Sequence, residues 1–193
     1  MQDIATKTAL RAESLARRAA LSPEARSAAA RSMRDALLGV PEVEMAGTVA
    51  AYVSIGSEPD TRGLLFALWK RGTYVLLPQL LPDGDLDWAS YEGPDSLAPG
   101  PRGLPEPTEP ARGPEAVASA DVVLVPALAV DRAGMRLGRG GGSYDRALAR
   151  VGPAILTVAL VYDADLVDVL PGEAHDRPVR AVVTPAEGFV RFP

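Results

Sequence analysis

The sequence predicts an α/β fold in which helices pack against a mostly parallel central sheet. Two stretches support this prediction. Residues 48–80 read as a strand, a helix and a second strand in succession, and the same pattern returns after residue 120. Strands that alternate with helices build parallel sheets, because each helix carries the chain back to the edge from which the next strand starts.

Two helices open the chain. Residues 3–21 are rich in alanine and leucine and contain no helix breaker. Residues 22–39 carry both ends of a helix in their sequence: Ser22 can cap it, Pro23 suits the first helical position, and Gly39 can terminate it. We therefore expect a helical pair before the first strand.

The later elements follow one another with clear boundaries. The segments that read as strands are 48–55, 73–80, 121–130, 155–163 and 180–185, and those that read as helices are 60–72 and 143–151. Residues 78–114 hold nine of the eighteen prolines and form either a linker between two domains or a long decorated loop with one strand at 86–91. We favour the loop, because neither flank is large enough for a comfortable core of its own.

Composition narrows the class of protein. The chain has 193 residues, of which 47% are hydrophobic, and a formal net charge of −5. These values suit one domain, 1–193, and argue against a partner that is a nucleic acid or an anionic membrane. Without cysteine and with one histidine, the chain excludes a disulfide, a thiolate nucleophile and a Cys- or His-rich metal site. A bound metal would be a hard cation held by carboxylates, such as Mg²⁺.

No segment suggests a membrane protein or an exported one. The longest apolar run, VVLVPALAV, is far shorter than the roughly 20 residues of a membrane helix. The N-terminus lacks the apolar core of a signal peptide. We therefore expect a cytoplasmic protein.

The glycine-rich segment GMRLGRGGGSYDR, residues 134–146, is the strongest functional signal. It lies between the most apolar predicted strand and a predicted helix, where open α/β sheets bind ligands. Successive glycines let backbone N–H groups surround an anion, and a helix N-terminus adds further donors. Arg136, Arg139 and Arg146 can bind phosphate oxygens. The segment predicts a phosphate-binding loop, the alternative being a flexible hairpin with solvated arginines.

This segment also resembles a known family signature. Residues 125–148, VPALAVDRAGMRLGRGGGSYDRAL, closely resemble the motif of the 5-formyltetrahydrofolate cyclo-ligase family, also called 5,10-methenyltetrahydrofolate synthetases. Shorter stretches match further family motifs in the family's order: KTALR, AYVSIGSEPDT, GLPEP and HDRPVRAVVTP. The resemblance spans nearly the whole chain.

The resemblance implies a three-layer α/β/α fold of the NagB/CoA-transferase-like type and an enzyme of folate one-carbon metabolism. Such a ligase uses ATP and Mg²⁺ to close 5-formyltetrahydrofolate to 5,10-methenyltetrahydrofolate, with release of ADP and phosphate. In this reaction the formyl oxygen takes the γ-phosphoryl group, N10 attacks the phosphorylated formyl carbon, and phosphate leaves. Phosphoryl transfer depends on positioning and charge neutralisation. We expect the protein to act as a monomer.

The family motifs also imply roles for particular residues. Lys7 and Arg11, four residues apart on one helix face, would contact the ATP phosphates. Asp145 and Asp176 would bind Mg²⁺. The ATP loop would comprise Arg136, Leu137, Gly138, Arg139, Gly140, Gly141, Gly142, Ser143 and Tyr144. The residues facing the folate would be Val53, Glu58, Arg139, Gly140, Gly141, Gly142 and Ser143, and the catalytic residues would be Arg139 and Asp145.

Several of these residues also have ordinary structural interpretations. Lys7 and Arg11 could form a solvated basic face, and Asp145 could stabilise a helix N-terminus. Tyr144 could stack on a ligand ring or pack in the core. Asp131 is better explained as a turn former than as a ligand, and His175 as an exposed neighbour than as a catalyst.

The sequence departs from the family pattern at four positions. Ser143 stands where a tyrosine is usual, and Gly141 where a lysine is frequent. Val130 and Ala127 replace a common phenylalanine and glycine. Two alternatives to the ligase therefore stay open: a non-catalytic nucleotide- or folate-binding regulator on the same fold, and a sugar-phosphate isomerase or CoA-transferase-like enzyme.

Overall fold

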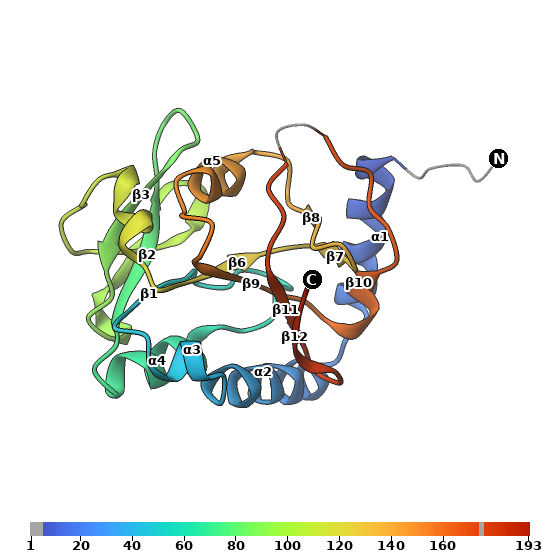
Figure 1. Cartoon of the computed structure of the whole chain (residues 1–193), viewed down its shortest axis with the longest axis horizontal. Coiled ribbons are helices and arrows are strands. Elements are labelled where there is room, and N and C mark those ends of the chain that lie inside the picture. The colour runs from blue at the N-terminus through green and yellow to red at the C-terminus, as the bar shows by residue number, and fades with distance from the viewer. Residues whose placement is uncertain (1–5, 174–175) are drawn as a thin grey trace.

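The computed structural model describes residues 6–173 and 176–193, and its centre is a mostly parallel sheet (Figure 1). Within the described residues this sheet has seven strands in the order β12-β11-β9-β6-β1-β2-β3. The five inner strands run parallel, while β3 and β12 pair antiparallel at the two edges. The strands are β1 (Thr48–Ala50), β2 (Tyr74–Leu80), β3 (Leu86–Ser90), β6 (Val122–Pro126), β9 (Leu156–Leu160), β11 (Ala181–Thr184) and β12 (Gly188–Arg191).

Helices cover both faces of this sheet, which gives the three layers that the family resemblance implies. On one face lie α2 (Pro23–Leu38), α3 (Pro41–Glu44) and α4 (Arg62–Lys70), and on the other α5 (Ser143–Ala149) with the 3-10 segment η3 (Pro114–Ser119) (Figure 1). The predicted signals of the second helix are confirmed, because Ser22 Oγ accepts a hydrogen bond from Ala25 N at 3.2 Å and Gly39 ends the helix. None of the described helices combines the length and apolar character needed to cross a membrane.

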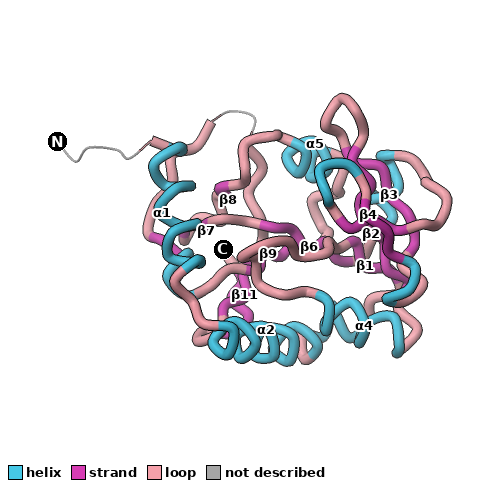
Figure 2. The backbone as a smooth tube through the Cα atoms, turned by 180° about the vertical axis from the view of Figure 1, so that it is seen from behind, coloured by secondary structure: helices cyan, strands magenta, loops and turns pink. Residues whose placement is uncertain are grey.

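The first helix, α1 (Lys7–Ala19), lies beside a small second sheet at one end of the molecule (Figures 1 and 2). This sheet joins β10 (Leu166–Val167), β7 (Ala129–Asp131) and β8 (Arg136–Leu137). A buried ion pair fixes the helix here: Arg18 Nε lies 2.7 Å from Asp165 Oδ2, and both side chains are only 1% exposed. Arg18 also donates to the carbonyl oxygens of Ala127 and Leu128. The helix is therefore held directly against the chain that leaves β6.

The proline-rich segment joins the main sheet. Its predicted strand is β3, which pairs antiparallel with β2 so that Pro78 faces Trp88. The segment also forms a two-stranded ribbon of β4 (Leu97–Pro99) and β5 (Pro105–Pro107), with the 3-10 turns η1 (Pro94–Ser96) and η2 (Pro101–Gly103). Residues 78–114 thus supply an edge strand and a ribbon next to β2.

Besides the strand expected at 155–163, which ends as β9 at Leu160, two predicted strands diverge from the structure. The strand expected at 48–55 ends as β1 at Ala50, and residues 51–55 continue as irregular chain beyond the sheet. The strand expected at 121–130 divides at Ala127 into β6 and β7, because the chain after Pro126 leaves the main sheet and pairs with β10. Both divergences occur where chain leaves the carboxyl ends of parallel strands, and they create the concave region described next.

Candidate active site

A cavity of about 880 Å³ opens at the carboxyl ends of β1, β2 and β6. Tyr52 and Glu58 enter it from the chain after β1, Leu80 from the end of β2, and Leu128 from the chain after β6. The N-terminal half of α1, the glycine-rich loop and residues 102–106 complete its walls. The volume is in the range of small-molecule sites, and its position is the one at which open α/β sheets bind ligands.

One end of the cavity is strongly polar. Lys7 Nζ lies 2.8 Å from Asp176 Oδ2 and 3.0 Å from Glu173 Oε1. Burial lowers the pKa of Lys7, but its hydrogen bonds to Asp176 and Glu173 outweigh that effect and raise the pKa above its usual value. Arg11 Nε donates to the carbonyl oxygen of Gly138 at 2.9 Å. The structure thus brings the N-terminal basic pair, the glycine loop and residues 173 and 176 together.

The glycine loop curves around this polar end. Gly140 and Gly142 have φ values of 100° and 69°, a left-handed conformation that other residues rarely adopt. A Cβ atom at Gly140 would also lie 3.4 Å from the guanidinium carbon of Arg11. Glycine at these positions therefore permits the curvature of the loop.

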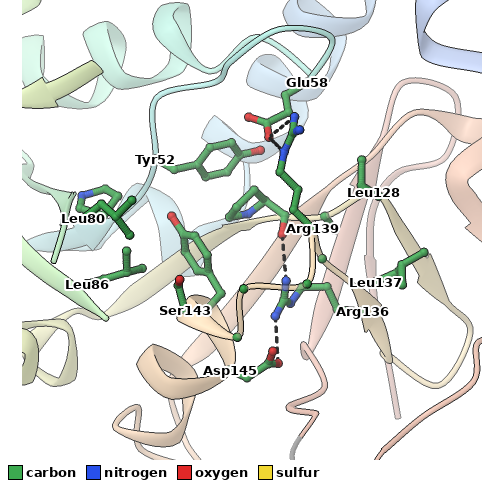
Figure 3. A pocket seen from close by; sticks show the side chains of 18 of the residues that line it. Tyr52, Glu58, Leu80, Leu86, Leu128, Arg136, Leu137, Arg139, Ser143 and Asp145 are labelled. Atoms are coloured by element: carbon green, nitrogen blue, oxygen red, sulfur yellow. Dashed lines mark hydrogen bonds and ion pairs between the residues drawn. The ribbon is translucent and has the colours of Figure 1, made fainter. Parts of the chain in front are cut away.

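An ion pair between Arg136 and Asp145 anchors the glycine loop (Figure 3). Arg136 Nη2 lies 2.9 Å from Asp145 Oδ1, and the arginine side chain is only 3% exposed. Arg136 also donates to the carbonyl oxygen of Pro126, and Asp145 Oδ1 accepts from the backbone N–H of Arg177. Arg136 thus links the end of β6 to the start of α5, and Asp145 lies next to the segment that carries Asp176.

A second ion pair lies at the opposite side of the cavity. Glu58 Oε2 accepts from the backbone N–H of Ile55 at 2.9 Å, and Glu58 Oε1 lies 3.3 Å from Arg139 Nη2 (Figure 3). The Glu58 side chain is 8% exposed, whereas that of Arg139 is 50% exposed. Glu58 is therefore fixed by a backbone hydrogen bond, while Arg139 contacts it with a side chain that is half exposed to solvent.

The remaining wall is apolar and aromatic. Its apolar side chains are Val53, Ile55, Pro78, Leu80, Leu86, Leu104, Pro105 and Pro126. Tyr52 and Tyr144 add phenol groups whose oxygens are buried and have no hydrogen-bond partner among the described residues. Burial, with a smaller contribution from the Glu58 carboxylate, raises the pKa of both phenols well above the usual value. The cavity thus has a cationic end for anions and an apolar end, lined by buried phenols, for a ring system.

Comparison with known proteins agrees with this geometry. The model of the "5-formyltetrahydrofolate cyclo-ligase family" matches residues 3–185. The chain belongs to this family. Curated cyclo-ligases of Mycolicibacterium smegmatis and Escherichia coli K12 are 40% and 36% identical to it. The alignments cover 96% of both proteins in the first case, and 89% of this chain and 96% of the relative in the second.

Solved structures agree in fold. The NMR structure of Aquifex aeolicus 5,10-methenyltetrahydrofolate synthetase superposes with a TM-score of 0.82 at 32% identity, covering 96% of this chain and 92% of that one. The synthetase of Mycoplasma pneumoniae superposes with a TM-score of 0.74 at 20% identity, covering 92% and 98%, and supports the fold alone. The α/β fold predicted from the sequence is that of the cyclo-ligase family.

The structure places all of the predicted site residues of the cyclo-ligase motifs on one cavity. Asp131, which the sequence indicates to be a turn former and not a ligand, is buried. It accepts hydrogen bonds from the backbone N–H groups of Ala133, Met135 and Leu170, as a turn former does. His175 lies outside the described residues. The aliphatic wall at Leu80, Leu86 and Leu104 was missed, because nothing in a short apolar sequence distinguishes a cavity wall from core.

Ser143, which replaces the family's usual tyrosine, connects two distant segments. Its hydroxyl donates to the carbonyl oxygen of Gly84, in the turn between β2 and β3, and Arg146 donates to the same oxygen. Arg150 binds the neighbouring Asp85 through both carboxylate oxygens. The start of α5 is thus docked onto the β2–β3 turn.

A Ser143→Ala variant is expected to lose about 0.5–1.5 kcal/mol in the free energy of unfolding, because the Gly84 carbonyl loses one of its two donors. Urea denaturation measures this loss. Ser119→Ala is the control, since Ser119 makes only a local, exposed bond to the Ala116 carbonyl. Equal stabilities of the two variants would contradict a role for Ser143 in joining α5 to the hairpin.

Proposed function

We propose that the protein is an ATP- and Mg²⁺-dependent 5-formyltetrahydrofolate cyclo-ligase that forms 5,10-methenyltetrahydrofolate, ADP and phosphate. The observation that carries this proposal is one cavity that joins a cationic, glycine-lined end to an apolar end containing a buried carboxylate. The family to which the chain belongs implies ATP use and a folate substrate. We further propose that 1–193 is one domain acting as a cytoplasmic monomer without a nucleic-acid partner, in keeping with its acidic charge.

The cationic end fits the triphosphate of ATP. Arg11 reaches from α1 to the glycine loop, and Lys7, Arg136 and Arg146 line the same cavity. Guanidinium and ammonium groups bind phosphate oxygens through charge-assisted hydrogen bonds. Glycines with positive φ let backbone N–H groups approach an anion without interference from side chains.

The donor set at this end also fits magnesium. Asp145 and Asp176 offer the hard carboxylate oxygens that Mg²⁺ prefers, and Mg²⁺ needs only one or two carboxylates when phosphates and water complete its shell. Among residues 6–173 and 176–193, no group of three or more acidic or histidine side chains could hold a metal. This agrees with an ion that is bound together with a nucleotide. Such an ion would neutralise phosphate charge.

The apolar end fits the pterin ring of the folate. The ring presents N–H donors along one edge, and Glu58 is a buried acceptor held in place by the Ile55 N–H. In the structure Arg139 is hydrogen-bonded to this carboxylate, because its Nε and Nη2 both donate to Glu58 Oε1 at 3.3 Å. When the N–H groups of the pterin edge replace Arg139 as the hydrogen-bond donors to Glu58, the exposed Arg139 side chain is free to move toward the phosphates. Substrate binding would thereby add a cation where the γ-phosphoryl group meets the formyl oxygen.

The decisive experiment mixes the protein with Mg-ATP and 5-formyltetrahydrofolate and follows the near-UV absorbance of the methenyl product. Product formation is expected only with ATP and Mg²⁺ present. A protein that binds both ligands without turnover would be a regulator, and activity on sugar phosphates without ATP would indicate an isomerase. Either result would overturn the proposal.

A Glu58→Gln variant is expected to raise the KM for 5-formyltetrahydrofolate about tenfold and leave the KM for ATP unchanged. The amide loses the charge that strengthens hydrogen bonds from ring N–H groups, while its oxygen can keep the bond from Ile55 N. Steady-state kinetics with each substrate varied separately measures both constants. The control is Glu187→Gln, since Glu187 also pairs with an arginine, Arg132, but lies outside the cavity. Equal folate KM values in the two variants would remove Glu58 from the folate site.

A further inference from the structure

The chain buries a phenol in the cavity, that of Tyr52, to which the family motifs assign no role. Tyr52 follows β1, is 3% exposed and packs its ring in the core between the sheet and α2 and α4. Its hydroxyl oxygen is buried and has no partner among the described residues. A buried hydroxyl without a partner costs about 1–3 kcal/mol, and Tyr52 is one of only two described tyrosines with such a hydroxyl that also line the cavity, so its retention there needs an explanation.

The orientation of this hydroxyl supplies one. Figure 3 shows Tyr52 pointing toward the Glu58–Arg139 pair, and Tyr52 lines the same cavity. The Glu58 carboxylate is close enough to contribute to the raised pKa of Tyr52, although burial is the main cause. The phenol therefore stays protonated at neutral pH and presents an O–H donor beside the acceptor Glu58.

Acceptor and donor side by side match one edge of a 4-oxopteridine. Along that edge the 2-amino group and N3–H donate, and the adjacent O4 carbonyl accepts. A carboxylate can satisfy the two donors, but it cannot donate to O4. A protonated phenol next to the carboxylate completes the pairing.

We infer that Tyr52 is a specificity-determining residue for the folate, whose phenolic O–H donates to the O4 carbonyl of the pterin while Glu58 accepts from the adjacent ring N–H groups. This inference rests on the proposed function, since it concerns the same folate site. It assigns the unpartnered hydroxyl to substrate binding: the free protein leaves the group unpaired, and the bound ring pairs it. A site built in this way rejects analogues that lack the matching polar group.

The test is Tyr52→Phe, which removes the hydroxyl and keeps the ring in the core. We expect the dissociation constant for 5-formyltetrahydrofolate, measured by calorimetry without ATP, to rise about fivefold to tenfold. The folate KM should rise in parallel, with kcat within about twofold and the KM for ATP unchanged. Thermal stability should be equal or higher, because an unpaired buried group is gone.

Tyr162→Phe is the matched control. Tyr162 is also buried with an unpartnered hydroxyl, yet it does not line the cavity. Its variant should bind the folate like wild type. Wild-type folate affinity in Tyr52→Phe, or equal rises in the KM for ATP and for folate, would overturn the inference while leaving the ligase assignment intact. A wild-type protein that neither binds nor converts 5-formyltetrahydrofolate would overturn the proposed function itself.

Discussion

An Asp145→Asn variant is expected to lose about 100-fold or more in kcat while remaining folded. Asp145 lies at the cationic end of the cavity, where its carboxylate is one of two proposed magnesium ligands. Asparagine keeps an oxygen that can accept from Arg136, but it removes the negative charge that holds a hard cation. Loss of the metal would remove several kcal/mol of charge stabilisation at the phosphates. Steady-state turnover at saturating ATP, titrated with Mg²⁺, measures the effect.

The choice of asparagine separates this role from a structural one. Asp145→Ala would leave the Arg136 guanidinium, with only 3% of its side chain exposed, without its ion-pair partner, and would therefore also destabilise the fold. Asp121→Asn is the control, because Asp121 accepts backbone N–H bonds from Gly47 and Thr48 far from the cavity. Wild-type kcat with unchanged magnesium dependence in Asp145→Asn would contradict the metal role.

Features with local causes could be predicted from the sequence. Ser22 caps α2 and Gly39 ends it, because capping depends on residues within one turn of the helix terminus. The strand–helix alternation predicted the parallel sheet, since the hand and length of such crossovers leave few arrangements. The glycine loop could be located because five glycines stand within thirteen residues between a predicted strand and a predicted helix, and two of them, Gly140 and Gly142, adopt positive φ in the structure.

Features that depend on distant contacts could not be predicted. Ser143 and Gly84 are 59 residues apart, and no property of either residue indicates that they meet. Tyr52 read as one more residue of a buried strand, yet the strand ends at Ala50 and the phenol enters the cavity. The missing information is where the chain leaves the sheet, which tertiary packing decides and local propensity does not.

The contact that fixes α1 gives the second large prediction. An Asp165→Ala variant is expected to lose about 3–5 kcal/mol in the free energy of unfolding, because it leaves the guanidinium of Arg18 buried without a counter-charge. Asp165 also accepts from Ser14 and Arg17, so the variant removes the contacts of three side chains of α1 at once. Urea denaturation monitored by circular dichroism measures the loss. Because Lys7 projects from the same helix, the KM for ATP should rise as well.

A double variant distinguishes two causes of this instability: the unpaired buried charge of Arg18, and the loss of the attraction between Arg18 and Asp165. Arg18→Met combined with Asp165→Leu removes both charges and fills similar volume, so it should recover at least half of the stability that Asp165→Ala loses. Removal of the exposed Arg132–Glu187 pair should cost less than about 1 kcal/mol, since water screens it. A double variant as unstable as Asp165→Ala would show that the attraction itself stabilises the helix. Recovery would show instead that the pair sets the position of α1, and with it the position of the phosphate-binding side chains.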